Sequence, residues 1–284
     1  MVKINLIQAH LFMQLTSLEN LMENRPKKSL GQNFLIDKNI INLIVDLGEI
    51  NQNDTVLEVG PGTGNLTKAI LLKKPKKLIV IEKDKNLASS LKKKLKDQIT
   101  IINDDILKIN ENNIANKPMT IYGNLPYNIS TQILAKWIKN NNFNNIAKNL
   151  ILMFQKEVAD RIIANTNEKT YGRLSILSCW KMKIKKIIDI NPNSFYPSPK
   201  IKSTVLFFEP KKKYFKLNNP NNLEHITRVF FNQKRKMIKK PLKLLFKNNI
   251  EISNKLGINL NLRPQNLSPM TYFKLCDEYE NLSK

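Results

Sequence analysis

The feature that most limits how this chain can fold is the regular alternation of short β-rich runs with segments of helical spacing. Five apolar runs of strand length occur between residues 55 and 154, and helical segments separate or follow them. The runs are continuously apolar, which is typical of strands buried on both faces of a parallel sheet. Helices that alternate with such strands cover both faces of the sheet. The pattern therefore predicts an α/β domain with a doubly wound, mainly parallel sheet.

The sheet is expected to have seven strands. The candidate strands are Thr55–Val59, Lys77–Ile81, Ile99–Ile102, Met119–Tyr122, Leu150–Phe154, Ile184–Ile190 and Thr204–Phe208. We expect the last two to complete the sheet as an antiparallel edge. Helical spacing occurs at residues 40–45, from about residue 65, and at residues 87–95, 131–138 and 158–163.

The composition changes at Pro210, which three lysines follow. Beyond it only helical patterns occur, at Leu223–Phe231, at Lys239–Phe246 and from Ser268, where serine suits the N-cap and the following proline suits the first turn. Pro241 is unfavourable inside the second of these helices. We therefore expect residues 25–210 to form the α/β domain and residues 211–284 to form a small all-helical domain.

The N-terminal residues, the lack of long apolar runs, and the few cysteines and histidines indicate in which compartment the protein is expected. Residues 1–24 lack the apolar core of a signal peptide, so we expect a disordered extension or a start codon assigned too far upstream. No apolar run approaches the length of about 18 residues that a transmembrane helix needs, so no membrane partner is expected. The two cysteines and two histidines show no metal-ligand spacing, which predicts no metal, reduced thiols and a cytoplasmic protein.

The charge of the chain is strongly positive. Against 23 acidic residues it has 47 Lys and Arg, a formal net charge of +24. Such an excess favours a polyanionic partner, although an AT-rich genome also enriches lysine. The excess is concentrated between Lys211 and Lys247, where twelve basic residues accompany the single acidic residue Glu224. We predict that this segment contacts RNA phosphates through Lys234, Arg235, Lys236, Lys239, Lys240 and Lys243.

A glycine-rich turn follows the first expected strand, in the sequence Glu58-Val-Gly-Pro-Gly-Thr-Gly64. Gly60 and Gly62 allow a sharp turn and the close approach of a ligand to the backbone. The dinucleotide fingerprint requires a further glycine where Asn65 stands, so the turn suits a ligand without a pyrophosphate. Glu82 ends the next strand and can accept hydrogen bonds from ribose hydroxyls. Asp105 follows the third strand and can accept one from an adenine amine.

The most specific motif is Gly123-Asn-Leu-Pro-Tyr127, just past the fourth strand and therefore at the same edge of the sheet. An adenine amine is a poor nucleophile because its lone pair is delocalised into the ring. The Asn124 side-chain oxygen and the Leu125 main-chain carbonyl can accept its two N–H bonds and turn the lone pair toward a methyl donor. Pro126 fixes the backbone, and Tyr127 offers a face on which an unstacked base can rest. An ordinary turn is the alternative reading of these residue types.

Taken together, these residues make the chain similar to the bacterial small-subunit ribosomal RNA adenine N6,N6-dimethyltransferases, the KsgA family. The similarity covers residues from Arg25 to the C-terminus. Its blocks are Gln32–Leu35, Glu58–Gly64, Asn124–Tyr127, Gln155–Val158, Tyr171–Ser175, Phe195–Lys200 and Phe231–Lys236.

The resemblance implies a Rossmann-like fold of the class I methyltransferases that use S-adenosylmethionine. It implies cofactor contacts from Asn33, Leu35, Gly60, Gly62, Glu82, Asp105 and Asn124. It also implies that Phe195 joins Tyr127 in holding the target base. Members of the family dimethylate two adjacent adenines in the 3′-terminal hairpin loop of 16S rRNA, late in small-subunit assembly.

Three other functions remain open from the sequence, of which methylation of adenine in DNA is the weakest, because the chain has no evident module for reading duplex sequence. The related 23S rRNA methyltransferases of the macrolide-resistance type share an Asn-x-Pro-Tyr motif. A mainly non-catalytic assembly factor of the small subunit is the second alternative, although the intact Asn124–Tyr127 motif favours an enzyme. A monomer is the default expectation for the oligomeric state.

Overall fold

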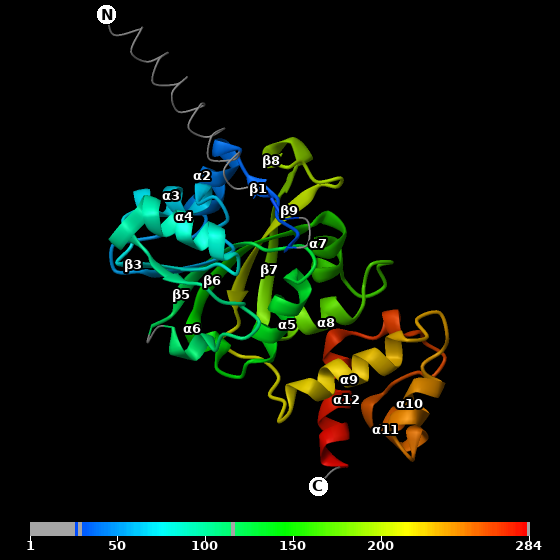
Figure 1. The fold of residues 1–284 in the computed structure, drawn as a ribbon. Coiled ribbons are helices and arrows are strands. Elements are labelled where there is room, and N and C mark those ends of the chain that lie inside the picture. The colour runs from blue at the N-terminus through cyan, green and yellow to red at the C-terminus, as the bar shows by residue number, and fades with distance from the viewer. Residues whose placement is uncertain (1–25, 28–29, 115–116, 283–284) are drawn as a thin grey trace, which may run out of the picture.

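The computed structural model describes residues 26–27, 30–114 and 117–282, so the expected extension 1–24 lies outside the described residues. Its centre is a seven-stranded sheet with the order β4-β3-β2-β5-β6-β9-β7, which confirms the expected number of strands (Figure 1). The strands are β2 (Thr55–Val59), β3 (Lys77–Ile81), β4 (Thr100–Ile102), β5 (Met119–Asn124), β6 (Ala147–Gln155), β7 (Met182–Ile190) and β9 (Ser203–Pro210).

The last two strands of this sheet in chain order, β7 and β9, complete it at one edge through antiparallel pairing, as expected. Their order in the sheet is the reverse of their order in the chain: β9 lies between β6 and β7 and is antiparallel to both, so that β7 at the edge runs in the same direction as β6. The residue patterns explain this order. Most residues of β9 are buried, which suits an inner strand, whereas β7 carries exposed lysines, Lys183 among them, that suit an edge.

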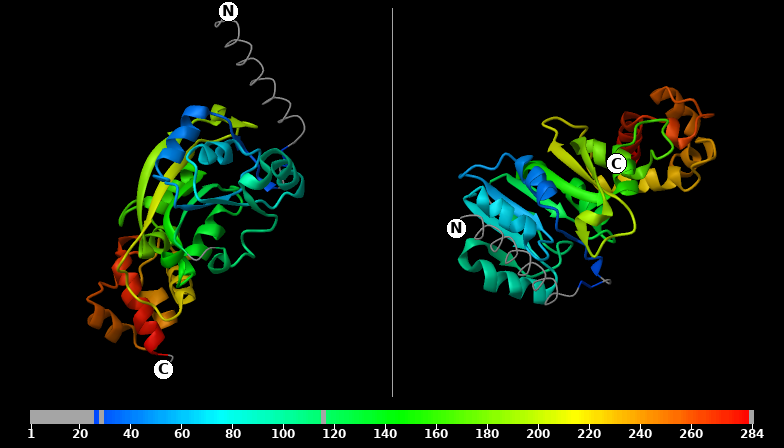
Figure 2. Two further views of the ribbon diagram at one scale, coloured as in Figure 1. Left: turned by 90° about the vertical axis from the view of Figure 1, so that its left-hand side faces the viewer. Right: turned by 90° about the horizontal axis from the view of Figure 1, so that it is seen from above.

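Helices cover both faces of the sheet, as Figures 1 and 2 show. One apolar cluster packs α2 (Lys38–Asp46), α3 (Asn65–Leu72) and α4 (Lys85–Leu95) against one face. A larger cluster packs the helices α5 (Ser130–Lys139), α7 (Lys156–Ile163) and α8 (Arg173–Lys181) against the other. Successive strand residues alternate between the two clusters, since neighbouring side chains on a strand point to opposite faces. The expected doubly wound architecture is confirmed.

The C-terminal segment forms four helices: α9 (Pro220–Phe231), α10 (Lys239–Leu245), α11 (Asn249–Leu256) and α12 (Pro269–Asn281). They group together beside α8 (Figure 1) and share its apolar cluster. Ser268 caps α12 by accepting a hydrogen bond from the Thr271 N–H. Pro241 is compatible with α10 because it lies in the first turn, where no backbone N–H is needed for a helical hydrogen bond.

Within the described residues, no helix combines the length and apolar character that a membrane span requires.

Candidate active site

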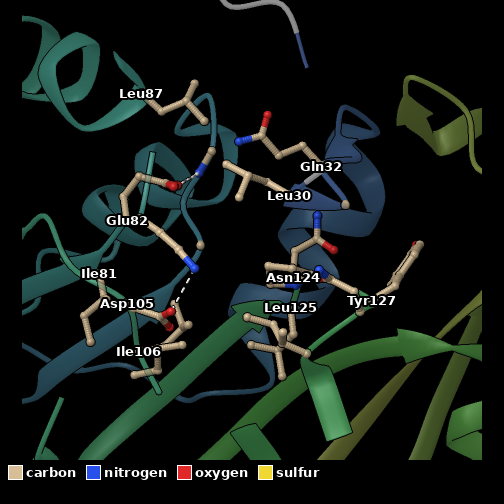
Figure 3. Close-up of a pocket in the computed structure, with 18 of the residues that line it drawn as sticks. Leu30, Gln32, Ile81, Glu82, Leu87, Asp105, Ile106, Asn124, Leu125 and Tyr127 are labelled. Atoms are coloured by element: carbon tan, nitrogen blue, oxygen red, sulfur yellow. Dashed lines mark hydrogen bonds and ion pairs between the residues drawn. The ribbon is translucent and has the colours of Figure 1, made fainter. Parts of the chain in front are cut away.

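A cleft opens at the carboxyl ends of the parallel strands and encloses about 900 Å³, counted out to its mouth. Gly60, Glu82, Asp105 and Asn124, which lie at or just beyond the ends of β2, β3, β4 and β5, all line it. Figure 3 shows Glu82 and Asp105 on one wall and Asn124, Leu125 and Tyr127 on the opposite wall. The parallel topology therefore brings together groups that are far apart in the sequence, as expected for an open α/β sheet.

The glycine turn forms the floor between the two walls. Gly60 and Gly62 have φ angles of 72° and 57°, in the left-handed region that disfavours other residues. A Cβ atom on Gly62 would lie 2.7 Å from the Phe34 ring. The φ angles therefore favour glycine at both positions, and at Gly62 the nearby Phe34 ring also leaves no room for a side chain.

Glu82 is buried, and it is fixed by two main-chain hydrogen bonds. Its carboxylate accepts from the N–H of Gly62 at 3.1 Å and from the N–H of Asp84 at 2.8 Å. Burial raises the pKa of Glu82 above its usual range, and these hydrogen bonds oppose the rise. The carboxylate thus connects the glycine turn to the end of β3 and presents its remaining acceptor capacity to the cleft.

Asp105 is held by a neighbouring cation. It pairs with the Lys83 ammonium at 2.8 Å and accepts from the N–H of Leu107 at 3.0 Å. The hydrogen bond from Lys83 is the main reason why the pKa of Asp105 is lowered. Asp105 therefore stays ionised at the cleft wall.

The segment before β1 (Phe34–Leu35) closes one side of the cleft. Leu30, Gln32 and Asn33 line it, and the Gln32 amide donates to Asp84 at 3.3 Å. Lys27 also pairs with Asp84, at 2.8 Å. Burial alone would raise the pKa of Asp84, but the hydrogen bonds from Lys27, Asn86 and Gln32 hold it below its usual range.

The Asn-Leu-Pro-Tyr motif begins within β5, whose last residue is Asn124, and not just past the strand as expected. The Asn124 Nδ2 donates to the main-chain oxygen of Asn33 at 2.8 Å. This bond uses the amide nitrogen and leaves the oxygen as the group available to accept. The Pro126 carbonyl accepts from the N–H groups of Ile129 and Ser130, so α5 begins directly after the motif.

Two of the expected site residues do not line the main cleft. Leu35 and Phe195 pair with each other across the two-stranded sheet of β1 and β8 (Phe195–Tyr196). Both are buried in the apolar cluster that includes α2 and α3. Leu35 lines a smaller neighbouring cavity with Gly60 and Asn124. In this conformation the Phe195 ring packs in the core, where burial of its apolar surface is favourable, and does not face a base in the cleft.

Sequence reasoning did not assign a role to several cleft residues. They are Leu30, Gly31, Gln32, Phe34, Val59, Ile81, Lys83, Leu87, Asp104, Ile106, Asn128 and Ile129. Gln32 and Phe34 lie in a block that was recognised for its resemblance. The apolar residues gave no signal because their side chains are also typical of ordinary core positions.

The expected RNA-contact residues lie in or next to α10, beyond the C-terminal end of α9. Arg235, Lys236, Lys239, Lys240 and Lys243 are exposed, and none of them forms an ion pair with a carboxylate of the described residues. Lys234 differs, because its ammonium donates to the main-chain oxygens of Lys169 and Tyr171 in the α7–α8 loop. Lys234 thus holds this loop to the C-terminal helices, and five of the six cations are available to a polyanion.

Glu58 is a buried carboxyl under the glycine turn. It is 1% exposed, and its Oε2 has no hydrogen-bond partner among the described residues. Burial raises its pKa from 4.5 to about 8. The folded state therefore binds a proton that the unfolded chain releases above pH 4.5, so this group costs stability progressively as the pH rises from about 4.5 to 8.

We expect Glu58→Gln, which imitates the protonated form of Glu58, to lose less stability than the parent as the pH rises. Each pKa unit corresponds to about 1.4 kcal/mol, so the variant should be several degrees more heat-stable than the parent at pH 9 and close to it at pH 4.5. Thermal unfolding followed by circular dichroism at both pH values measures the difference. An equal change at the two pH values would contradict the assignment of the titration to Glu58.

Among the described residues, no three His, Cys, Asp or Glu side chains gather in a way that could hold a metal ion.

Comparison with known proteins gives a consistent family. A family model described as ribosomal RNA adenine dimethylase matches residues 23–281. The chain is 59% identical to ribosomal RNA small subunit methyltransferase A of Pelagibacter ubique, over 91% of this chain and 98% of that protein. It is 42% identical to the protein of the same name in Malacoplasma penetrans, over 90% and 92% of the two chains.

Two solved structures resemble the fold. A dimethyladenosine transferase from Plasmodium falciparum superposes with a TM-score of 0.76 at 28% identity, over 88% of this chain and 98% of that chain. The 23S rRNA methyltransferase ErmE superposes with a TM-score of 0.65 over 89% and 100% of the two chains. Its identity of 21% shows a shared fold and does not bear on the target.

Proposed function

The chain belongs to the ribosomal RNA adenine dimethylase family, and from this premise we propose its target and its site residues. It transfers methyl groups from S-adenosylmethionine to N6 of two adjacent adenines in the 3′-terminal hairpin loop of 16S rRNA, within the small ribosomal subunit. The observation that carries the proposal is the Asn124 amide. Its nitrogen is fixed on Asn33, and it lies across the cleft from Glu82 and Asp105.

The cleft suits S-adenosylmethionine by shape and by its hydrogen-bonding groups. Gly60 and Gly62 line the cleft without side chains, so that a ligand can approach the backbone closely. Glu82 would accept the ribose hydroxyls, and Asp105 would accept the adenine amine of the cofactor. Bound there, S-adenosylmethionine supplies an electrophilic methyl group on its sulfonium.

The residues of the opposite wall would prepare the target amine. The Asn124 oxygen and the Leu125 carbonyl accept the two N–H bonds, which directs the nitrogen lone pair into the cleft. Among the described residues, the Leu125 carbonyl has no hydrogen-bond partner, whereas the Pro126 carbonyl is occupied by the start of α5. No strong base is needed, because the methylated, cationic amine readily loses a proton to water. Catalysis then consists of orientation and electrostatic stabilisation.

We also propose that the two parts of the chain have different functions. Residues 25–210 bind the cofactor and perform methyl transfer, and residues 211–284 bind RNA through the exposed cations around α10. Phosphate contacts of this kind position the enzyme, and selection of the site comes from RNA shape and from a loop base that is easily unstacked. The enzyme works in the cytoplasm as a monomer.

We expect the affinity for the small subunit to fall steeply with salt, because each neutralised phosphate releases counterions. Lys239→Gln combined with Lys240→Gln should reduce the slope of log K against log salt by about two. The matched control is Lys92→Gln with Lys93→Gln on α4, which is far from α10 in all three views (Figures 1 and 2). Equal slopes for the parent and the α10 variant would contradict the assigned RNA surface.

The direct test is transfer of labelled methyl groups to purified small subunits, naked 16S rRNA and 23S rRNA side by side, followed by mapping of the labelled base. We expect label on two adjacent adenines of the small subunit. Label on 23S rRNA alone would favour the macrolide-resistance type of enzyme. Tight binding to small subunits without any label would favour a mainly non-catalytic assembly factor.

A further inference from the structure

Ser203 makes a contact with the active site that is separate from the cofactor residues. It is the first residue of β9, and there it pairs with Gln155 of β6 and Ile190 of β7. Its side chain is fully buried, and its Oγ shares a hydrogen bond of 2.6 Å with the Tyr127 hydroxyl. Ser203 thus contacts the hydroxyl of Tyr127, the end of that side chain farthest from the main chain of the Asn-Leu-Pro-Tyr motif.

Tyr127 is held both at its main chain and at its hydroxyl. The main chain of Tyr127 is held in the turn before α5, where its carbonyl accepts from the Ser130 hydroxyl at 3.3 Å. The far end of the ring is held by Ser203. Burial raises the pKa of the Tyr127 hydroxyl, so it stays protonated and keeps the hydrogen bond at physiological pH. Tyr127 is among the residues that line the cleft, and its side chain points away from the wall that carries Glu82 and Asp105 (Figure 3).

We propose that Ser203 is a positioning residue that fixes the plane of the Tyr127 ring on which the target adenine stacks, and that the second methylation depends on it more than the first. The proposal rests on the proposed function, because it concerns the same reaction. Ser203 does not line the cleft and acts only through Tyr127.

The difference between the two methylations follows from counting N–H bonds. An unmodified adenine amine has two, one for the Asn124 oxygen and one for the Leu125 carbonyl. After one methyl transfer the amine has one N–H, so one of these two acceptors loses its partner. The stacking platform then carries a larger share of the orientation, since base–aromatic stacking does not depend on the number of N–H bonds. A platform that is free to tilt should therefore slow the second transfer selectively.

The test measures the ratio of N6-methyladenosine to N6,N6-dimethyladenosine in small subunits after a limited reaction, by mass spectrometry of the digested rRNA. We expect Ser203→Ala to slow the second transfer roughly three- to tenfold more than the first, the effect of one net hydrogen bond. Tyr127→Phe should give the same ratio, and the double variant should be no worse than either single one. Calorimetry should show unchanged affinity for S-adenosylmethionine.

Ser178→Ala is the matched control, since Ser178 is equally buried and its hydroxyl has no partner among the described residues. A parental product ratio in both Ser203→Ala and Tyr127→Phe, or additive effects in the double variant, would overturn the proposal. Because Tyr127→Phe removes only the hydroxyl of a half-buried side chain, it decides the matter even if Ser203→Ala folds poorly. Absence of methylation by the parent protein would instead refute the proposed function.

Discussion

Asn124→Ala should reduce methyl transfer to small subunits by about 10²- to 10³-fold or more, the usual effect of removing a preorganised group that stabilises the transition state. The substitution removes the acceptor that orients the target amine, and it also removes the donor that holds the Asn33 carbonyl at 2.8 Å. Subunit binding should change little, because it is assigned to the cations around α10. Single-turnover methylation and a binding assay on the same preparations measure the two effects separately.

The control for this variant is Asn53→Ala, an exposed asparagine in the turn before β2. Asn124→Asp adds a second test, since it keeps an acceptor oxygen but loses the donor to Asn33. Its activity should remain low because the side chain is no longer anchored. Parallel loss of subunit binding and methylation in Asn124→Ala would show that this residue serves the fold and not the reaction.

Glu82→Ala should lower the affinity for S-adenosylmethionine at least about a hundredfold, since hydrogen bonds to a charged group contribute about 1.5–3 kcal/mol each. The variant loses the acceptor proposed for the ribose hydroxyls. It also frees the N–H groups of Gly62 and Asp84, so the glycine turn loses its fixed position. Isothermal titration calorimetry with S-adenosylmethionine gives the dissociation constant.

Asp97→Ala is the control for this second prediction, because Asp97 is exposed and lies away from the cleft in the 3₁₀ turn after α4. Circular dichroism establishes that both variants are folded at the temperature of the titration. Undiminished affinity in folded Glu82→Ala would remove Glu82 from the cofactor site and would leave the ribose without its proposed partner.

Much of the fold was accessible from the sequence because its signals are local. Continuous apolar runs such as Thr55–Val59 and Lys77–Ile81 are strands with these same bounds in the structure. The N-cap at Ser268 followed from residue type alone. The seven-stranded, doubly wound sheet followed from the alternation of strands and helices, since a parallel strand pair requires a crossover that covers one face.

The position of β9 between β6 and β7 was not accessible in this way. Hydrophobic patterns show that a strand is buried, but they do not determine which neighbours it pairs with. Val205 and Leu206 of this strand pack into the apolar clusters on the two faces of the sheet, as residues of the other inner strands also do. The two-stranded sheet of β1 and β8 was missed for a related reason, since each strand has two residues and 161 positions separate their starts, Phe34 and Phe195.

By itself the sequence determined the glycine turn, the acidic residues at the strand ends and the Asn-Leu-Pro-Tyr motif, because these depend on residue type and on position relative to a strand. Only the tertiary structure decided what holds them: Asn33 on Asn124, and Ser203 on Tyr127. It also placed the Phe195 ring in the core and gave Lys234 a structural partner. Such contacts join residues distant in sequence, and they depend on the packing of the whole sheet, which no local pattern encodes.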